Sequence, residues 1–381
     1  MKKVLIILSL IITMQLFNAT AFSEISKNKY YDERIYCRAK IIAIEKKRIN
    51  EGAAQLTETK VHLKILDGAF KNQKKTAIFK GEDELPKEMF YTEGDIVFIG
   101  ISSVGSDDPV EYISLYDVDN SNGIIILTAL LCISIIIVGR IKGFFSLIAL
   151  IITVLLVFVI LIPLTLKGYP PLPIAVVISL LSIIITLPVI AGLRLKTLAA
   201  ILGASSGIIL ASLLAVIFAW FMHLSGIVTT DMLTVFYASN IDINLRGLAL
   251  SGMIIAALGA IMDVCISIAS STAEIFSANP KITQRAAFRS VLTVGTDILG
   301  SMVNTLILAY VGSSLSLILL ISIRFEPSMP FWMIFNYNPV LSEIVKSVVG
   351  SIGMFMSIPI TALLAVKLYH RKNRTHREES A

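Results

Sequence analysis

Charged residues and cysteines are scarce in this chain of 381 residues. Only 16% of its side chains are charged, and its three cysteines lie far apart at Cys37, Cys132 and Cys265. Cys37 stands alone in a polar segment and the other two lie in apolar runs, so their spacing forms neither a disulfide framework nor a metal motif. We therefore expect no bound metal and no cofactor.

The signatures of ATP-driven machines and zinc proteases are also missing. The sequence has no G-x-x-x-x-G-K-[ST] phosphate-binding loop and no H-E-x-x-H zinc helix. We expect a protein that is not an enzyme. Any energy that it uses would come from an ion gradient or from a partner subunit.

The chain is rich in apolar residues. Hydrophobic residues make up 55% of it and the mean hydropathy is +0.80, well above the values of soluble domains. The length leaves room for one small soluble domain and a bundle of membrane helices. Acidic and basic residues nearly balance in residues 22–120, so the net charge of +6 comes from the membrane part.

The N-terminus has the pattern of an export signal. Two lysines, an apolar core of about ten residues and the small residues Ala19 and Ala21 predict a signal peptide over residues 1–21. An uncleaved anchor with the same orientation is the alternative. Both interpretations place residues 22–120 outside the cell membrane.

Residues 22–120 predict a small exported domain of β-strands. Turn signals at Asp67-Gly68 and Gly94-Asp95 separate segments that alternate or run apolar. We expect an all-β fold, OB-like or another small barrel, with strands at 34–45, 59–66, 75–81, 93–102 and 110–118. Such a domain suits a protein partner, whereas the lack of an aromatic and basic stripe argues against nucleic acid.

Residues 121–367 predict a polytopic α-helical membrane bundle, which makes the fold class mixed. Seven apolar runs are near the length that crosses the hydrocarbon core, at 123–139, 143–166, 174–193, 198–222, 247–271, 298–322 and 344–366. Residues 290–323 could instead hold two spans, broken near Gly312. We expect 282–296 to form a cytoplasmic, interfacial amphipathic helix that leads into a span starting near Asp297, which places this acid near the membrane boundary.

Basic residues set the expected orientation in the cell membrane. With residues 22–120 outside, seven spans put the turns around Arg140, Arg194 and Lys281 on the cytoplasmic side, where basic residues gather. The basic tail at 368–381 is then cytoplasmic, whereas eight spans would export it.

An aspartate inside an apolar run is the main functional signal. At 100° per residue, Asp263 shares one helix face with three small residues and three polar ones, Gly252, Ala256, Gly259, Ser267, Ser270 and Glu274. The small residues would let another helix approach closely. An acid aligned with serines inside a span favours an ion or substrate path, and the alternative is a structural helix contact.

A second polar face follows in the next helical segment. Thr293, Asp297, Ser301 and Asn304 are spaced by four, four and three residues, so they share one side of a helix. We expect the two faces to meet each other or to line one cavity, with Asn304 facing Asp263.

Several blocks resemble the YibE/F-like family of bacterial integral membrane proteins. They are GAIMDVCISIASSTAEI, GTDILGSMVNTLILAYVGSSL and VVGSIGMFMSIPITAL, and LDGAFKNQKKT resembles the family's extracytoplasmic region. Cys265 and the pair Thr272-Ala273 are departures. The resemblance implies a membrane topology and places family polar positions at Asp263, Ser267, Ser270, Glu274, Asp297, Asn304 and Tyr310. It implies little about activity, because members are described as uncharacterised and sometimes as transporters.

Three classes of function fit these features. The first is a secondary transporter or permease for an unidentified small solute or ion, with the acids on its path. The second is a non-transporting scaffold or accessory subunit that binds a partner through residues 22–120. The third is an intramembrane aspartyl protease, which is disfavoured because G-T-D at 295–297 lacks that class's second glycine and the two acids are expected at different depths.

Overall fold

The computed structural model describes residues 35–51, 54–68, 70–82, 91–104, 110–227, 232, 243–324 and 330–379. The predicted signal peptide at residues 1–21 lies outside the described residues. The chain forms two compact units, of which the first ends at Ser134 and the second continues from Ile135. Each unit has its own hydrophobic core.

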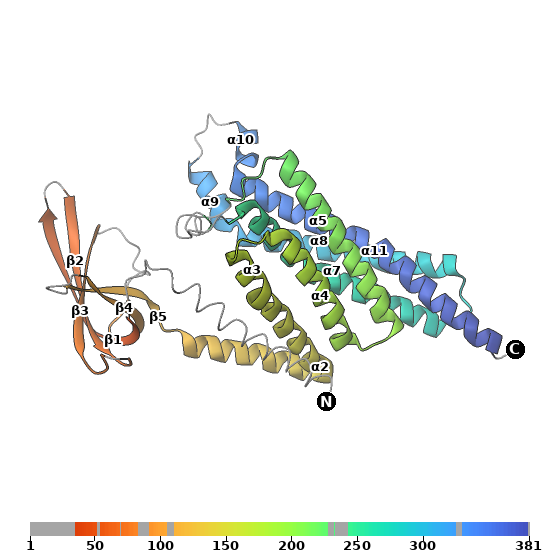
Figure 1. The fold of residues 1–381 in the computed structure, drawn as a ribbon, viewed down its shortest axis with the longest axis horizontal. Coiled ribbons are helices and arrows are strands. Elements are labelled where there is room, and N and C mark those ends of the chain that lie inside the picture. Colours follow the sequence, from red (N-terminus) through yellow and green to blue (C-terminus); the bar gives the residue numbers. More distant parts are fainter. Residues whose placement is uncertain are drawn as a thin grey trace. The chain divides into compact units, whose positions relative to one another are not determined.

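The first unit contains the predicted five strands, all paired antiparallel in the order β3-β2-β1-β4-β5 (Figure 1). Their bounds are β1 Ile35–Glu51, β2 Ala54–Ile65, β3 Lys74–Glu82, β4 Ile96–Val104 and β5 Val110–Val118. Alternation places one apolar side chain in two on the buried face, where Ile41, Leu63 and Ile99 are almost fully covered. The five predicted strands are thus confirmed, although β1 and β2 are longer than expected.

The expected small barrel is wrong in one respect, because the sheet is not closed. In the described residues, β3 and β5 are the two edges and no ladder joins them. Bulges at Ile41/Ala43 and Val97/Ile99 bend the central strands without bringing the edges into register. An open sheet keeps unpaired backbone groups at both edges, so a barrel-type ligand cavity does not follow from this fold.

A charged cluster ties this sheet to the first helix. Arg38 donates to Asp67 at 2.7 Å and to Asp119 at 3.5 Å, and Asp119 in turn accepts from the backbone N–H of Ser121. The backbone N–H of Arg38 and then its guanidinium lower the pKa of Asp67. The cluster fixes the start of α2 (Ser121–Leu156) at the end of β5.

The second unit consists of long apolar helices. In the described residues, six helical runs are long and apolar enough to cross a membrane. The first combines α2 with η2 Val157–Leu161 and α3 Ile162–Leu166, and the others are α4 Pro171–Ala191, α5 Leu195–Phe221, α7 Leu245–Ala278, α8 Gln284–Ser313 and the part of α11 (Asn338–Glu379) up to Asn373. Two short helices, α9 Leu315–Arg324 and α10 Phe331–Phe335, precede α11.

The predicted count of seven spans differs from these six at the first run. Residues 123–139 and 143–166 form one 46-residue run, but Arg140 has φ 49° and ψ −131° and interrupts the helix. A methyl group added at Gly143 would collide with the carbonyl oxygen of Ile135, so the chain bends sharply there. A straight helix of this length would measure about 69 Å, twice the hydrocarbon thickness, and the bend lies at the turn that the sequence predicted.

The bounds expected for the span at 298–322 are wrong. A single helix, α8, runs without a break from Gln284 to Ser313, so it joins most of residues 282–296 to the first part of that expected span. The chain breaks at Ser314, close to the predicted break at Gly312, and α9 has only 10 residues. Asp297 therefore lies near the middle of α8.

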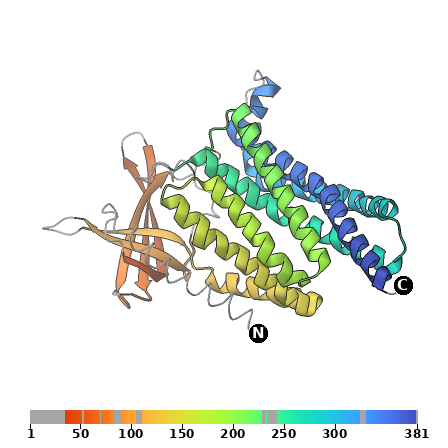
Figure 2. The ribbon, with the colours of Figure 1, turned by 45° about the vertical axis from the view of Figure 1, so that its right-hand side comes forward.

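The closest helix contact joins α5 and α11, which lie side by side in Figures 1 and 2. A methyl group added at Gly353 would lie 2.7 Å from Ala211 Cβ and 3.1 Å from the Gly207 carbonyl oxygen. The G-x-x-x-G spacing of Gly203 and Gly207 is the signal for this approach, which sequence reasoning missed. The same G-A-S-S-G run also has the letters of a serine-hydrolase elbow, but it lies inside a helix and not at a strand-to-helix turn.

We predict that Gly353→Ala lowers the thermal stability of the purified protein, because the added methyl group overpacks this contact at a cost of about 1–3 kcal/mol. Gly252→Ala is the matched control, since nothing lies within 4 Å of a methyl group added there. The control should be neutral or more stable, because alanine favours helix over glycine. Melting in detergent, followed by size-exclusion fluorescence, measures both. Equal melting temperatures would contradict the observed packing of α5 on α11.

Candidate functional site

The predicted polar face of α7 is exposed along most of its length. Gly252, Ala256, Gly259, Asp263 and Glu274 are exposed, and Ser267 and Ser270 are partly covered. The opposite side of the helix, which includes Ile254, Ile261 and Ile268, is buried in the bundle core. The acid-bearing face therefore points away from the helices on which α7 packs.

Asp263 lies near the middle of the 34-residue helix α7. In the described part of the chain its carboxylate has no hydrogen bond and no ion pair; only its backbone carbonyl accepts a bond, from Ser267 Oγ at 2.7 Å. The Ser267 hydroxyl is thus satisfied by its own helix, which makes it tolerable next to hydrocarbon. The Asp263 carboxylate has no such internal partner.

The small residues beside Asp263 do not form a helix contact within one chain. Nothing lies within 4 Å of a methyl group added at Gly252 or at Gly259. Neighbouring helices pack on other sides of α7 instead: Met262 contacts Thr186 of α4, and Ile268, on the buried side, lies against α8. The helix-packing role predicted for Gly252, Ala256 and Gly259 therefore has no partner in the described residues.

The polar face of α8 is also exposed. Thr293, Asp297, Ser301 and Asn304 all lie on the uncovered side of the helix. The hydroxyls of Thr293 and Ser301 donate to backbone carbonyls of the preceding turn, at 3.1 and 3.0 Å. Asp297 and Asn304 have no side-chain partner among the described residues, so they resemble Asp263 in this respect.

The two acids lie at similar depths, contrary to expectation. A methyl group added at Gly295 would lie 3.2 Å from Ile268 Cδ1, which fixes the antiparallel register of α7 and α8. Asp263 lies five residues before Ile268 in α7, and Asp297 lies two residues after Gly295 in α8. Because the two helices are antiparallel, both steps lead away from the turn that connects them. At 1.5 Å per residue the acids differ in depth by about 5 Å.

The two polar faces nevertheless do not meet. Five residues turn a helix by about 140°, so Asp263 points well away from Ile268 and from α8. Two residues turn it by about 160°, so Asp297 points away from Gly295 and from α7. The predicted cavity between the faces, with Asn304 opposite Asp263, is therefore not formed within one chain.

A lysine from α5 reaches the C-terminal end of the α7 face. Lys196 Nζ, at the start of α5, donates to Ser270 Oγ at 3.4 Å. Phe276 near the end of α7 stacks on Tyr369 of α11 with ring centroids 5.8 Å apart. This end of the face is thus anchored and carries a positive charge, whereas the region around Asp263 is open.

A second polar centre lies toward the other end of the bundle. Lys346 Nζ is 3.3 Å from Glu343 Oε2, and it also lies 4.8 Å from the centre of the Tyr310 ring. The Tyr310 hydroxyl is buried and has no partner among the described residues. Glu343 and Lys346, three residues apart on α11, thus form an ion pair, and the resemblance had placed a polar position at Tyr310.

The described residues do not meet the requirements of a metal site. Within the described ranges, no group of three His, Cys, Asp or Glu side chains is close enough to hold an ion. Cys265 is buried on the core side of α7, where it accepts from Thr361 Oγ1 at 3.3 Å. Its role is one of packing.

Comparison with known proteins identifies the membrane unit. A family model described as YibE/F-like protein matches residues 127–371, well over half of the chain. The chain belongs to the YibE/F-like family. Neither the curated proteins nor the solved structures that were searched contain a match. The matched range of the YibE/F-like model begins within α2, ends within α11 and includes all of the candidate site, but not the strands of the N-terminal sheet.

We predict that the α7 face meets water rather than acyl chains. In a variant without Cys37, Cys132 and Cys265, a cysteine at position 256 should react with a hydrophilic maleimide in membranes. A cysteine at position 257 should stay unreactive, because Ala257 is 1% exposed and faces the core. If neither position reacts in native membranes and only position 256 reacts in detergent, lipid covers the face and the prediction is wrong.

Proposed function

We propose that this polytopic YibE/F-like protein is a secondary transporter, with a solute or ion path along the exposed face of α7. The observation that carries the proposal is Asp263, a mid-helix carboxylate that has no partner in the described residues and points out of the bundle. A charged group in that position is costly against hydrocarbon, so its surroundings are expected to be wet or ionic. Aspartates in such positions commonly bind or relay cations and protons.

The neighbouring residues support a path rather than an isolated acid. Gly252, Ala256 and Gly259 leave free space beside the helix on one side of Asp263. Lys196 and Ser270 lie on the other side, toward the basic end of the bundle. A solute would thus move along the small apolar residues of this face to a polar section that contains Asp263 and Lys196.

The exposed position of this face implies that one chain does not complete the path. Asp297 and Asn304 on α8 are likewise uncovered, and they need a polar neighbour for the same reason. We infer that another protein surface closes the path in the membrane. No covalent step is part of the proposal, and we expect no enzymatic activity.

Neutralising Asp263 tests the transport proposal. In proteoliposomes, Asp263→Asn should insert and fold normally but lose gradient-dependent flux, and Asp263→Glu should keep part of it because the charge is retained. Asp117→Asn, the same chemical change at an exposed site in the sheet, should transport like the wild type. The substrate is identified by screening ions and metabolites for uptake by wild-type but not by Asp263→Asn vesicles.

A folded Asp263→Leu protein with full flux would refute a role for this acid in transport. It would favour the second candidate, an accessory subunit that binds another protein. The uncovered polar faces of α7 and α8 suit that role as well, and the exported sheet has two free edges to which a strand could add. In that case a partner should copurify with the protein even when Asp263 and Asp297 are both neutralised.

We propose that the sheet lies outside and the C-terminus inside the cell. The turns that carry Arg194 and Lys281 lie at the same end of the bundle as the last turns of α11, as the bond from Asn373 to the Pro280 carbonyl indicates. Basic residues concentrate on the cytoplasmic side of membrane proteins.

A reporter that is active only in the cytoplasm, fused after residue 375, should therefore be active. The same reporter fused in the loop before α4, near Lys167, should be inactive because that loop lies at the opposite end. The reverse result for the two fusions would invert the topology.

A further inference from the structure

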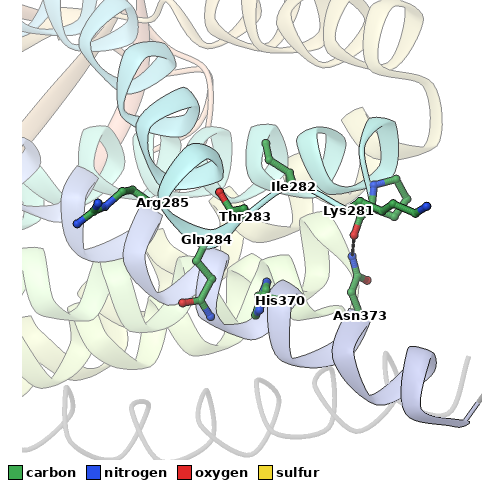
Figure 3. Close-up of a pocket in the computed structure, with 8 residues that line it drawn as sticks. Lys281, Ile282, Thr283, Gln284, Arg285, His370 and Asn373 are labelled. Carbon is green, nitrogen blue, oxygen red and sulfur yellow. Dashed lines mark hydrogen bonds between the residues drawn. The ribbon is translucent and has the colours of Figure 1, made fainter. Parts of the chain in front are cut away.

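An open basin lies at the basic end of the bundle, between the α7–α8 turn and the last turns of α11 (Figure 3). Its volume is about 610 Å³ and eight residues line it, Pro280, Lys281, Ile282, Thr283, Gln284, Arg285, His370 and Asn373. Figure 3 shows Gln284 and His370 near the middle of the lining, with the Lys281 and Arg285 side chains extending outward on opposite sides. One wall is closed by the hydrogen bond from Asn373 Nδ2 to the Pro280 carbonyl, at 3.4 Å.

The lining carries positive charge without acidic compensation. Lys281 and Arg285 are exposed, and neither has an acidic partner among the residues that the structure describes. None of the eight lining residues is an aspartate or a glutamate. The positive charges of Lys281 and Arg285 are therefore not neutralised by an acid in the described part of the chain. This favours binding of an anion in the basin.

The start of α8 adds to this positive potential. Thr283 caps the helix by accepting a bond from the Ala286 N–H at 3.3 Å, and the first turn contains no acidic residue. Helix N-termini carry a partial positive charge and usually have Asp or Glu nearby, whereas this one has Arg285. The start of α8 and the Gln284 and Asn373 amides thus line one space, and two exposed cationic side chains lie beside it.

We propose that this basin binds a phosphate group, carried by the headgroup of an anionic phospholipid or by free phosphate. Phosphate matches the site because its oxygens accept bonds from backbone N–H groups at a helix N-terminus and are attracted by the lysine and arginine side chains nearby. The basin lies at the end of the bundle that we expect in the cytoplasm, where basic pockets between helices hold anionic headgroups. The proposal goes beyond the transport role and does not depend on it.

The test is binding of phosphatidylglycerol to the full-length protein in detergent, measured by native mass spectrometry or thermal shift, with phosphatidylcholine as the neutral lipid. Lys281→Gln with Arg285→Gln should weaken binding about 10- to 30-fold, at about 1 kcal/mol for each lost charge. Gln284→Glu should also weaken it, and this variant should fold well because an acid suits a helix N-terminus. The matched control, Lys142→Gln with Lys372→Gln, removes two exposed charges that do not line the basin and should bind like the wild type.

Inorganic phosphate, added in a separate arm, distinguishes the two sources of the ligand. Protection by inorganic phosphate alone, lost in Lys281→Gln with Arg285→Gln, supports a site for free phosphate. Protection by phosphatidylglycerol that millimolar phosphate does not displace supports a lipid site. Equal losses in the basin variant and the matched control, or no loss in either, would overturn the proposal.

Discussion

A carboxylate in the middle of a membrane helix needs water, an ion, a hydrogen-bond donor or a cation beside it, because acyl chains offer none of these. The hydroxyls of Ser267, Thr293 and Ser301 avoid this constraint by donating to their own helices. Asp263 and Asp297 cannot, and both point out of the bundle. The functional interpretation of the molecule depends on this difference between the polar groups of α7 and α8.

The glycines of the membrane unit are used in two different ways. In α5 and α11, Gly207 and Gly353 are in close contact and hold the bundle together. In α7, a methyl group added at Gly252 or Gly259 would have nothing within 4 Å among the residues that the structure describes. This face consists of small, uncovered residues beside an acid, so it is available to bind a solute, an ion or a further protein chain.

Much of the fold could be predicted from the sequence, because α4, α5, α7 and the five strands are bounded by clear turn signals and have distinct periodicities. The start of α8 could not, since the polar residues of 282–296 suit an interfacial helix and a continuous helix equally well. Closure of the sheet depends on how its two edges approach, which no local pattern encodes.

The candidate site was predictable as a set of residues but not as an arrangement. The spacing placed Asp263 and its neighbours on one face, and the structure has them there. Both α5 and α7 carry small residues four apart, so the sequence alone could not decide which of them packs and which stays open. The direction of each acid depends on the register of Gly295 against Ile268, a contact between helices that periodicity does not specify.

The most direct measurement is an electron cryomicroscopy map of the full-length protein in lipid nanodiscs. It should show ordered water, an ion or another protein chain against the Asp263 carboxylate and along Gly252 and Gly259. Acyl-chain density packed directly on Asp263, in a folded and active protein, would contradict the assignment of this face as a functional surface.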